Sequence, residues 1–353
     1  MIRTDEKYGG VATRGAPSCY LCGNVGVQLY QDRLDLLFDA PGLWDFRRCS
    51  NPSCALIWMD PVPLPRDIGK LYSHYYTHRD NQGAEVSRFR ELLRFVRDCY
   101  LADRYGYVDL VRRWQRPIGR LLYLFPSKRS VVDFDIMCLP ACPGLRLLEI
   151  GCGSGAFLSR MRRLGWDVCG LDPDSAAVSW GRRAYGLDIS CGTLDQANFP
   201  VDSFDVITMN HVIEHVHDPM ALLAECQRIL RPGGKLILTT PNANSWGHKI
   251  FARYWRGLEP PRHFMIFSLR NLEECTRRSN FHTLTLRSIS RWGRDIFVAS
   301  KQIRKQRKQT FLSRAWARFQ GCGFQIFENV AELFSVWSGE EIYFVGQKSH
   351  GRV

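Results

Sequence analysis

The sequence predicts an α/β fold of the doubly wound type, in which helices cover a mostly parallel sheet. Residues 146–150 are an apolar run of the kind found in buried strands. Glycine stands at every second position of 151–155, and residues 156–164 then have the apolar spacing of an amphipathic helix. Apolar runs and amphipathic segments go on alternating to residue 300, as they do in a doubly wound domain.

Seven strands are expected in a Rossmann-like sheet, because seven short apolar runs are flanked by turn residues. Six of them lie at 146–150, 167–172, 187–190, 204–209, 235–240 and 281–288. The last strand is expected at Glu341 to Val345, after a basic stretch and an amphipathic helix at about 311–337.

Composition divides the 353 residues into four parts. Residues 1–65 carry paired cysteines and several prolines, which predicts a small zinc-ribbon-like module. Residues 66–142 predict a basic helical linker or cap, with apolar residues between arginines. Residues 143–300 are the α/β domain, and residues 301–353 add a basic amphipathic helical insert and the final strand.

The formal net charge of +13 is concentrated in residues 88–129 and 291–318. A solvated helical face, an anionic substrate, a membrane surface and a nucleic acid remain open as explanations. The sequence has no run of 18 apolar residues and no apolar signal region, so neither a membrane span nor secretion is expected. The 13 cysteines, several within expected core elements, favour a reducing cytosol.

The glycine turn predicts a site for a nucleotide-type ligand, since strand, glycine turn and helix are how such ligands meet a parallel sheet. Asp172 ends the second expected strand, 21 positions after Gly151 (172 minus 151). A carboxylate there can accept hydrogen bonds from both ribose hydroxyls. This spacing also fits a dinucleotide enzyme, and Asp172 could instead cap the next helix.

Three later blocks narrow the choice of ligand. They are Phe199 to Asp205 before the fourth strand, Asn210-His211-Val212-Ile213-Glu214-His215 after it, and Arg231 to Lys235 before a strand that ends in Pro241-Asn242. This ordered set resembles the class I S-adenosylmethionine-dependent methyltransferases over about residues 145–300. It is most similar to ubiquinone-biosynthesis O-methyltransferases and to methyltransferases of cell-surface sugar gene clusters. The glycine turn lacks a Walker lysine, which argues against a nucleotide triphosphatase.

The resemblance implies roles for the matching positions. Glu149 to Gly155 would hold the methionine part of S-adenosylmethionine, Asp172 its ribose, and Thr193 and Leu194 its adenine, although many relatives have Asp where Thr193 stands. Asn210 and His211 would face the methionine end and the substrate. The expected cofactor-binding residues are Glu149, Gly151, Gly153, Gly155, Asp172, Thr193, Leu194 and Asn210.

A hydroxyl acceptor would need a base, and histidine is the usual one near neutral pH. The candidates are His211, His215 and His263, of which we expect His211 or His263 to take the proton. Glu214 and His215 match a metal-binding position of ubiquinone-type relatives, but His211 stands where an acid is common. A hydrogen-bonded pair at a helix start is therefore the open alternative to a divalent metal site.

The block Glu259-Pro260-Pro261-Arg262-His263-Phe264 follows the fifth strand in a stiff loop. Sugar-cluster relatives carry a similar Pro-Arg-His block. Arg262 and His263 are expected to contact the substrate, where Arg262 could bind a carboxylate or phosphate. A salt bridge that only anchors the loop is the alternative for Arg262.

Cys19, Cys22, Cys49 and Cys54 form two closely spaced pairs. Four thiolates suit a closed, tetrahedral and therefore structural zinc site. Ala55 stands where a glycine is common after such a pair. The stretch from Trp58 to Tyr72, Tyr75 and Tyr76 also resembles the N-terminal extensions of sugar-cluster methyltransferases.

The combined prediction is a cytoplasmic methyltransferase that modifies a small molecule or glycan precursor for polysaccharide biosynthesis, at a hydroxyl. One alternative is an RNA methyltransferase with an N-terminal zinc module, although the Asn/Asp-Pro-Pro-aromatic block of base methylators is absent after the fourth strand. Another is a non-catalytic binding module. An apolar face behind the basic stretch either contacts the inner face of a membrane or packs on the protein's own core. It carries Phe324, Phe327, Val330, Phe334 and Trp337.

Overall fold

The computed structural model describes residues 2–4, 6–72, 88–305, 311–332 and 334–349. The chain forms two compact units. The first unit comprises Met1–Tyr75, Asn210–Arg228 and Leu238–Val353, and the second comprises Tyr76–Met209 and Ile229–Ile237. Tyr75 and Tyr76, named in the sequence analysis, lie outside the described residues, as do Arg307 and Lys308 of the basic stretch 291–318.

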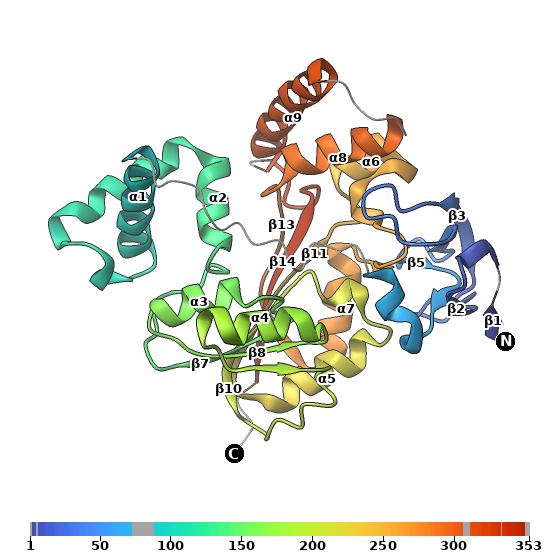
Figure 1. Ribbon diagram of the computed structural model, residues 1–353, viewed down its shortest axis with the longest axis horizontal. Helices are drawn as coiled ribbons and strands as arrows, with labels where there is room; N and C mark the ends of the chain where they lie inside the picture. Colours follow the sequence, from blue (N-terminus) through green and yellow to red (C-terminus); the bar gives the residue numbers. More distant parts are fainter. Residues whose placement is uncertain (1, 5, 73–87, 306–310, 333, 350–353) are drawn as a thin grey trace. The chain divides into compact units, whose positions relative to one another are not determined.

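The large sheet has seven strands in the order β13-β14-β11-β10-β7-β8-β9 (Figure 1). The strands are β7 Arg146–Ile150, β8 Asp167–Asp172, β9 Ile189–Cys191, β10 Phe204–Asn210, β11 Leu230–Pro241, β13 Phe281–Ile289 and β14 Glu341–Lys348. β7 is parallel to β8 and β10, β8 is parallel to β9, and β13 and β14 are antiparallel. The predicted doubly wound fold with seven strands is thereby confirmed.

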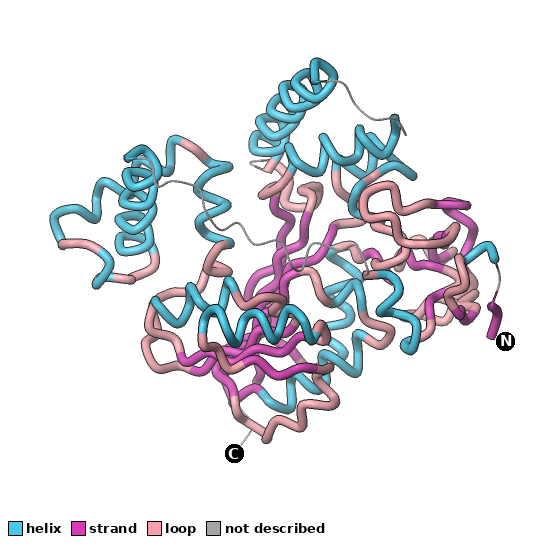
Figure 2. Tube along the Cα trace, in the orientation of Figure 1, coloured by secondary structure: helices cyan, strands magenta, loops and turns pink. Residues whose placement is uncertain are grey.

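In the second unit, helices α3 (Ala156–Arg163) and α4 (Ser175–Tyr185) pack against β8 (Figure 2). Gly170 of β8 makes this close packing feasible, because a Cβ there would lie 2.6 Å from Leu158 Cδ1 of α3. The side chain of Asp174 caps α4 by accepting hydrogen bonds from the amides of Ala176 and Ala177. Asp172 is therefore not the helix cap.

The basic segment before β7 is helical in its described part. Its elements are α1 Arg88–Arg104, η4 Val108–Leu110, η5 Arg113–Leu124 and α2 Pro126–Phe134. Gly119 lets η5 approach α1 closely, because a Cβ on Gly119 would lie 2.3 Å from the backbone of Tyr100. Asp133 of α2 accepts hydrogen bonds from the hydroxyls of Tyr100 and Tyr105.

The N-terminal part of the first unit shares its core with a distant segment. A four-stranded sheet has the order β12-β5-β4-β3, and a three-stranded sheet has the order β1-β2-β6. Trp44 and Phe46 pack in one hydrophobic cluster with Trp255, Phe264 and Ile266. The elements are β1 Ile2–Thr4, η1 Glu6–Tyr8, β2 Ala12–Arg14, β3 Gly26–Arg33, β4 Trp44–Cys49, β5 Ile57–Met59, β6 Val62–Pro63, η2 Pro65–Leu71 and β12 Met265–Ile266.

Further helices of the first unit follow β10 and β11 and separate β13 from β14 along the chain. They are η6 Ile213–His215, α5 Pro219–Ile229, α6 Trp246–Phe251, η7 Ala252–Tyr254, η8 Arg256–Leu258, α7 Leu269–Arg278, α8 Gly293–Lys305 and α9 Phe311–Ala331. Among the helices described, none combines the length and the apolar character needed to cross a membrane.

Candidate active site

The glycine turn after β7 adopts a backbone conformation that side chains disfavour. Gly151, Gly153 and Gly155 have φ angles of 71°, 52° and 78°. A Cβ on Gly155 would lie 2.6 Å from Leu187 Cδ1, so glycine is required there for packing as well. Beside Gly153, in contrast, no atom of the described residues lies within 4 Å of the position of a Cβ. The turn therefore presents open backbone at Gly153.

Asp172, at the end of β8, is hydrogen-bonded to this turn. One carboxylate oxygen accepts the amide of Gly153 at 2.7 Å, and the other accepts the amide of Asp174 at 2.8 Å. Burial raises the pKa of Asp172. The amide of Gly192 donates to the Asp172 carbonyl at 3.0 Å, which places the turn that follows β9 beside β8.

Thr193 and Leu194 follow directly in that turn. The Thr193 side chain is exposed, whereas that of Leu194 is buried. Among the residues expected to hold the cofactor, the structure thus brings together those at the carboxyl ends of β7, β8 and β9, which pair in parallel.

Glu149 of β7 is a buried acid with an oxygen that a bound ligand could contact. Its side chain is buried, and its Oε2 has no hydrogen-bond partner within the described part of the chain. Burial raises its pKa well above the ordinary value. An unpaired buried carboxylate is costly, and a cationic ligand would relieve that cost. The amino and sulfonium groups of S-adenosylmethionine are cationic, so these residues fit that cofactor.

His211 lies between two carboxylates in the first unit, just after β10. Its Nδ1 is 2.9 Å from Glu214 Oε1, and its Nε2 is 2.6 Å from Glu341 Oε1. Carboxylates only accept hydrogen bonds, so both ring nitrogens carry protons and the ring is an imidazolium. Burial alone would lower the pKa of His211, but the two carboxylates outweigh it and raise the pKa to about 10.

The two carboxylates are held in turn by other groups. Burial alone would raise the pKa of Glu214, but His211 lowers it to about 2, and Arg291 and His211 do the same for Glu341. Glu214 also accepts a hydrogen bond from Thr240 Oγ1 at 2.9 Å, and Arg291 Nη2 lies 3.2 Å from Glu341 Oε1. The network links the end of β10 to β11 and to the start of β14.

His215 and His263 are neutral, in contrast to His211. The Nδ1 of His215 lies 3.0 Å from both the Arg262 carbonyl and the Tyr72 hydroxyl. The Nδ1 of His263 lies 2.8 Å from the carbonyl of Gly257. A carbonyl only accepts, so each Nδ1 carries the proton and each ring has its lone pair on Nε2. Burial lowers the pKa of His215, and it lowers that of His263 to about 4.

Ligand atoms of Glu214, His215 and His263 lie within 4.8 Å of one another. Two imidazoles and one carboxylate are a known donor set for divalent metals. The sequence left a divalent metal at Glu214 and His215 open, and the geometry adds His263 as the third donor.

Arg262 is completely buried and anchors its loop. Its Nη1 is 2.7 Å from Asp35 Oδ2, its Nε is 3.0 Å from Glu259 Oε1, and its Nη1 also donates to the carbonyl of Leu71 at 3.1 Å. These are the contacts of the loop-anchoring alternative. A substrate that drew Arg262 Nε and Nη1 away from these partners would leave two buried carboxylates behind, which is costly.

Asn210, expected near the cofactor, lies in the first unit. Its Oδ1 accepts hydrogen bonds from Thr239 Oγ1 at 2.6 Å and from Arg291 Nη2 at 3.3 Å. Sequence reasoning missed Arg291 and Glu341 as members of this network. One signal in the sequence could have indicated them. Two adjacent acids, Glu340 and Glu341, stand at the start of an apolar strand, and acids that are buried there require charged or hydrogen-bonding partners.

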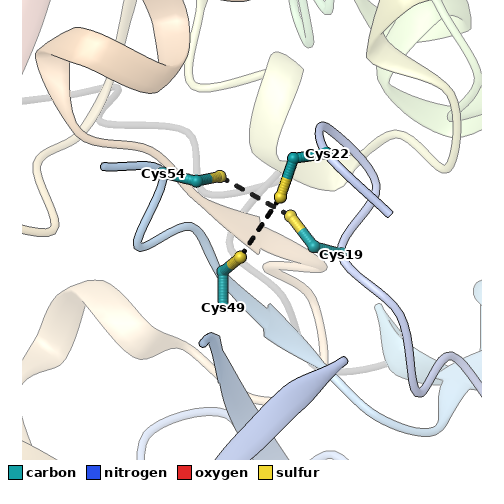
Figure 3. A group of neighbouring side chains, drawn as sticks. All are labelled: Cys19, Cys22, Cys49 and Cys54. Carbon is teal, nitrogen blue, oxygen red and sulfur yellow. Dashed lines mark hydrogen bonds between the residues drawn. The ribbon is translucent and has the colours of Figure 1, made fainter. Parts of the chain in front are cut away.

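The four cysteines of the N-terminal segment converge on one point (Figure 3). Cys19 Sγ is 3.6 Å from Cys54 Sγ, and Cys22 Sγ is 3.3 Å from Cys49 Sγ. Sulfurs on a tetrahedral zinc ion are about 3.8 Å apart, given Zn–S bonds of about 2.3 Å, so the spacing fits that ion. Ala55 has a φ of 50°, which is the left-handed conformation that favours glycine after such a pair.

Comparison with known protein families identifies the family of this chain. A family model described as a methyltransferase domain matches residues 105–286, which is more than half of the chain. The chain belongs to this methyltransferase-domain family. Its seven-stranded domain is that of a class I S-adenosylmethionine-dependent methyltransferase.

Curated relatives are named ubiquinone biosynthesis O-methyltransferase. The relative from Bradyrhizobium sp. (strain ORS 278) is 32% identical over 130 residues, which are 35% of this chain and 51% of the relative. The relative from Hahella chejuensis is 32% identical over 155 residues, covering 42% and 65%. The chain thus spans between half and two-thirds of these relatives. A solved S-adenosylmethionine-dependent methyltransferase from Archaeoglobus fulgidus is 17% identical, with a TM-score of 0.41, covering 65% of this chain and 94% of that one.

The pKa of His211 predicts how stability depends on pH. The pKa of His211 is about 10 in the folded state, against an ordinary value of 6.5. The protonated ring therefore contributes its full stabilisation below pH 6.5, and this contribution is lost as the pH rises toward 10. The free energy of unfolding in urea should therefore be much lower for His211→Gln than for the wild type near pH 6.5, and the difference should shrink toward pH 10. The exposed His282, changed to Gln, is the control. A difference that stays constant over this range would contradict a charged His211.

Proposed function

We propose that the protein transfers a methyl group from S-adenosylmethionine to a hydroxyl of a small molecule or glycan precursor. The observation that carries the proposal is the hydrogen bond from Gly153 to Asp172 beside the buried, unpaired carboxylate of Glu149. The bound cofactor would supply an activated methyl group. The names of the curated relatives support oxygen as the acceptor atom.

Roles for the chain's own residues follow from their chemistry. Asp172 would accept hydrogen bonds from the ribose hydroxyls, and the turn after β9 would border the adenine. Glu149 would offset the positive charge of the methionine part. Fixed positions for both reactants can lower the barrier by several kcal/mol, which is the main task left to the protein.

We assign the general base to His215 and keep His263 as its alternative. Both rings are neutral with a lone pair on Nε2, as a base requires, whereas the imidazolium of His211 has no free site for a proton. His215 is partly exposed and His263 is buried, which favours His215 for contact with an acceptor. His211 and Arg262 then act as positioning residues, since Arg262 supplies the carbonyl that orients His215.

Two further parts of the proposal concern the N-terminal cysteines and the cell compartment. A structural zinc ion at Cys19, Cys22, Cys49 and Cys54 would join the turn before β3 to the turn after β4. We place the enzyme in the cytoplasm, in polysaccharide biosynthesis, because the resemblance of its N-terminal stretch points to sugar-cluster enzymes.

An acceptor screen tests the function directly. Release of S-adenosylhomocysteine is measured with nucleotide sugars first, then catechol-type quinol precursors, then RNA, with and without EDTA. We expect turnover with a sugar nucleotide. Turnover with RNA alone would overturn the small-molecule proposal.

Once the acceptor is known, substitution of His215 tests its role as the base. His215→Ala should lower kcat by about 10²- to 10⁴-fold without weakening cofactor binding, while His282→Ala should change neither kcat nor cofactor binding. Near-normal turnover by His215→Ala would transfer the role to His263.

Zinc content and stability test the cysteine cluster. Elemental mass spectrometry of the purified protein should find one equivalent of zinc, and Cys49→Ser should lose it with a lower Tm, because the metal's binding energy contributes to folding. Cys322→Ser, at an exposed cysteine outside the cluster, is the matched control. Less than half an equivalent of zinc in the wild type would argue against the site.

A further inference from the structure

Helix α9 packs on α8 by one side (Figure 1). The side chains that it buries are those of Ala317, Phe324, Gln325 and Glu328. Gly321 makes the approach close, because a Cβ there would lie 3.0 Å from Arg294 of α8. The contact with α8 therefore covers the apolar surface of α9 on that side only.

The opposite side of α9 is apolar and exposed. Trp316 is 58% exposed and Phe319 is 69% exposed, and their rings stack with centroids 5.5 Å apart. With Ile326, Phe327 and Val330, these side chains occupy an arc of about 100° at 3.6 residues per turn. Beyond the helix the apolar surface continues with Phe334, Val336 and Trp337, which are all exposed. We call these eight residues the α9 apolar face.

The charges around this face are positive. Lys249 Nζ lies 4.4 Å from the ring centroid of Trp246, and that ring contacts Phe327 of the face. Arg318 is exposed on α9, about 80° beyond the edge of the face at 3.6 residues per turn. The acid within α9, Glu328, is buried on the α8 side. Apolar residues with tryptophans and with cations at their margin are the features of a helix that lies in the surface of an anionic membrane.

We propose that the α9 apolar face docks on the surface of an anionic lipid bilayer, with the helix parallel to the membrane plane. The aromatic side chains would enter the boundary between headgroups and acyl chains, and Lys249 and Arg318 would contact lipid phosphates. Charge favours this occupant over a second copy of the chain. Two copies joined through this face would bring the cations at its margin together, which like-charge repulsion opposes.

Vesicle co-sedimentation of the full chain tests the proposal. The wild type should bind vesicles of phosphatidylcholine mixed with phosphatidylglycerol, and salt should weaken the binding. Trp316→Ser combined with Phe319→Ser should weaken it by at least about tenfold, because the change removes two aromatic side chains from the apolar area that would enter the bilayer. Lys249→Glu combined with Arg318→Glu should also weaken it.

Matched controls separate docking from folding. Val201→Ser combined with Leu284→Ser removes two exposed apolar side chains elsewhere and should leave binding unchanged. All variants should keep the wild-type Tm, since the substituted side chains are exposed. The proposal is overturned if the wild type does not bind, if it binds phosphatidylcholine vesicles equally well, or if the aromatic variant binds like the wild type. Loss of a dimer in the aromatic variant, without vesicle binding by the wild type, would identify a second copy as the occupant.

Discussion

The pairing of His211 with Glu214 and Glu341 is the interaction on which the candidate catalytic region depends. Both carboxylates are buried, and a buried charge without a partner costs several kcal/mol. The imidazolium pairs with one oxygen of each carboxylate and holds the end of β10 against the start of β14. His211 itself has a φ of 55°, an unfavourable conformation for a side chain, so the network also stabilises a strained turn. Residues 213–215 follow at once, and their placement depends on that turn.

A second set of contacts connects the N-terminal segment to the same region within the first unit. Asp35 pairs with Arg262, and the carbonyl of Arg262 accepts a hydrogen bond from His215. Tyr72 reaches the same ring nitrogen of His215. Strand β4 ends at Cys49 and begins in the core that Trp44 shares with Phe264. The N-terminal segment therefore supports the loop of the candidate base through Asp35, Tyr72 and this core.

The strands and the glycine turn could be predicted because their signals are local. Apolar runs, glycine spacing and an acid at a strand end all lie within a few tens of residues. The charge of His211 could not be predicted, because it depends on Glu341, 130 positions away. The partner of Arg262 lies in the N-terminal segment for the same reason, and nothing in that segment shows that β12 completes its sheet.

Periodicity likewise could not decide which side of α9 packs. It grouped Phe324 with Phe327, but Phe324 is buried against α8 while Phe327 is exposed. The partner of a helix is set by the fold as a whole, so an amphipathic pattern alone leaves the inward side undetermined. The same limit applies to the candidate bases, whose protonation follows from hydrogen-bond partners that sequence spacing does not give.

Calorimetric titration with S-adenosylmethionine tests most directly whether the glycine turn and Asp172 form a cofactor site. The account predicts binding of one cofactor per chain, weakened about 10- to 150-fold in Asp172→Asn through loss of charge-assisted hydrogen bonds worth about 1.5–3 kcal/mol. Asp167→Asn, at an exposed aspartate at the amino end of the same strand β8, should bind like the wild type. Absence of binding by the folded wild type, or equal binding by Asp172→Asn, would contradict the account.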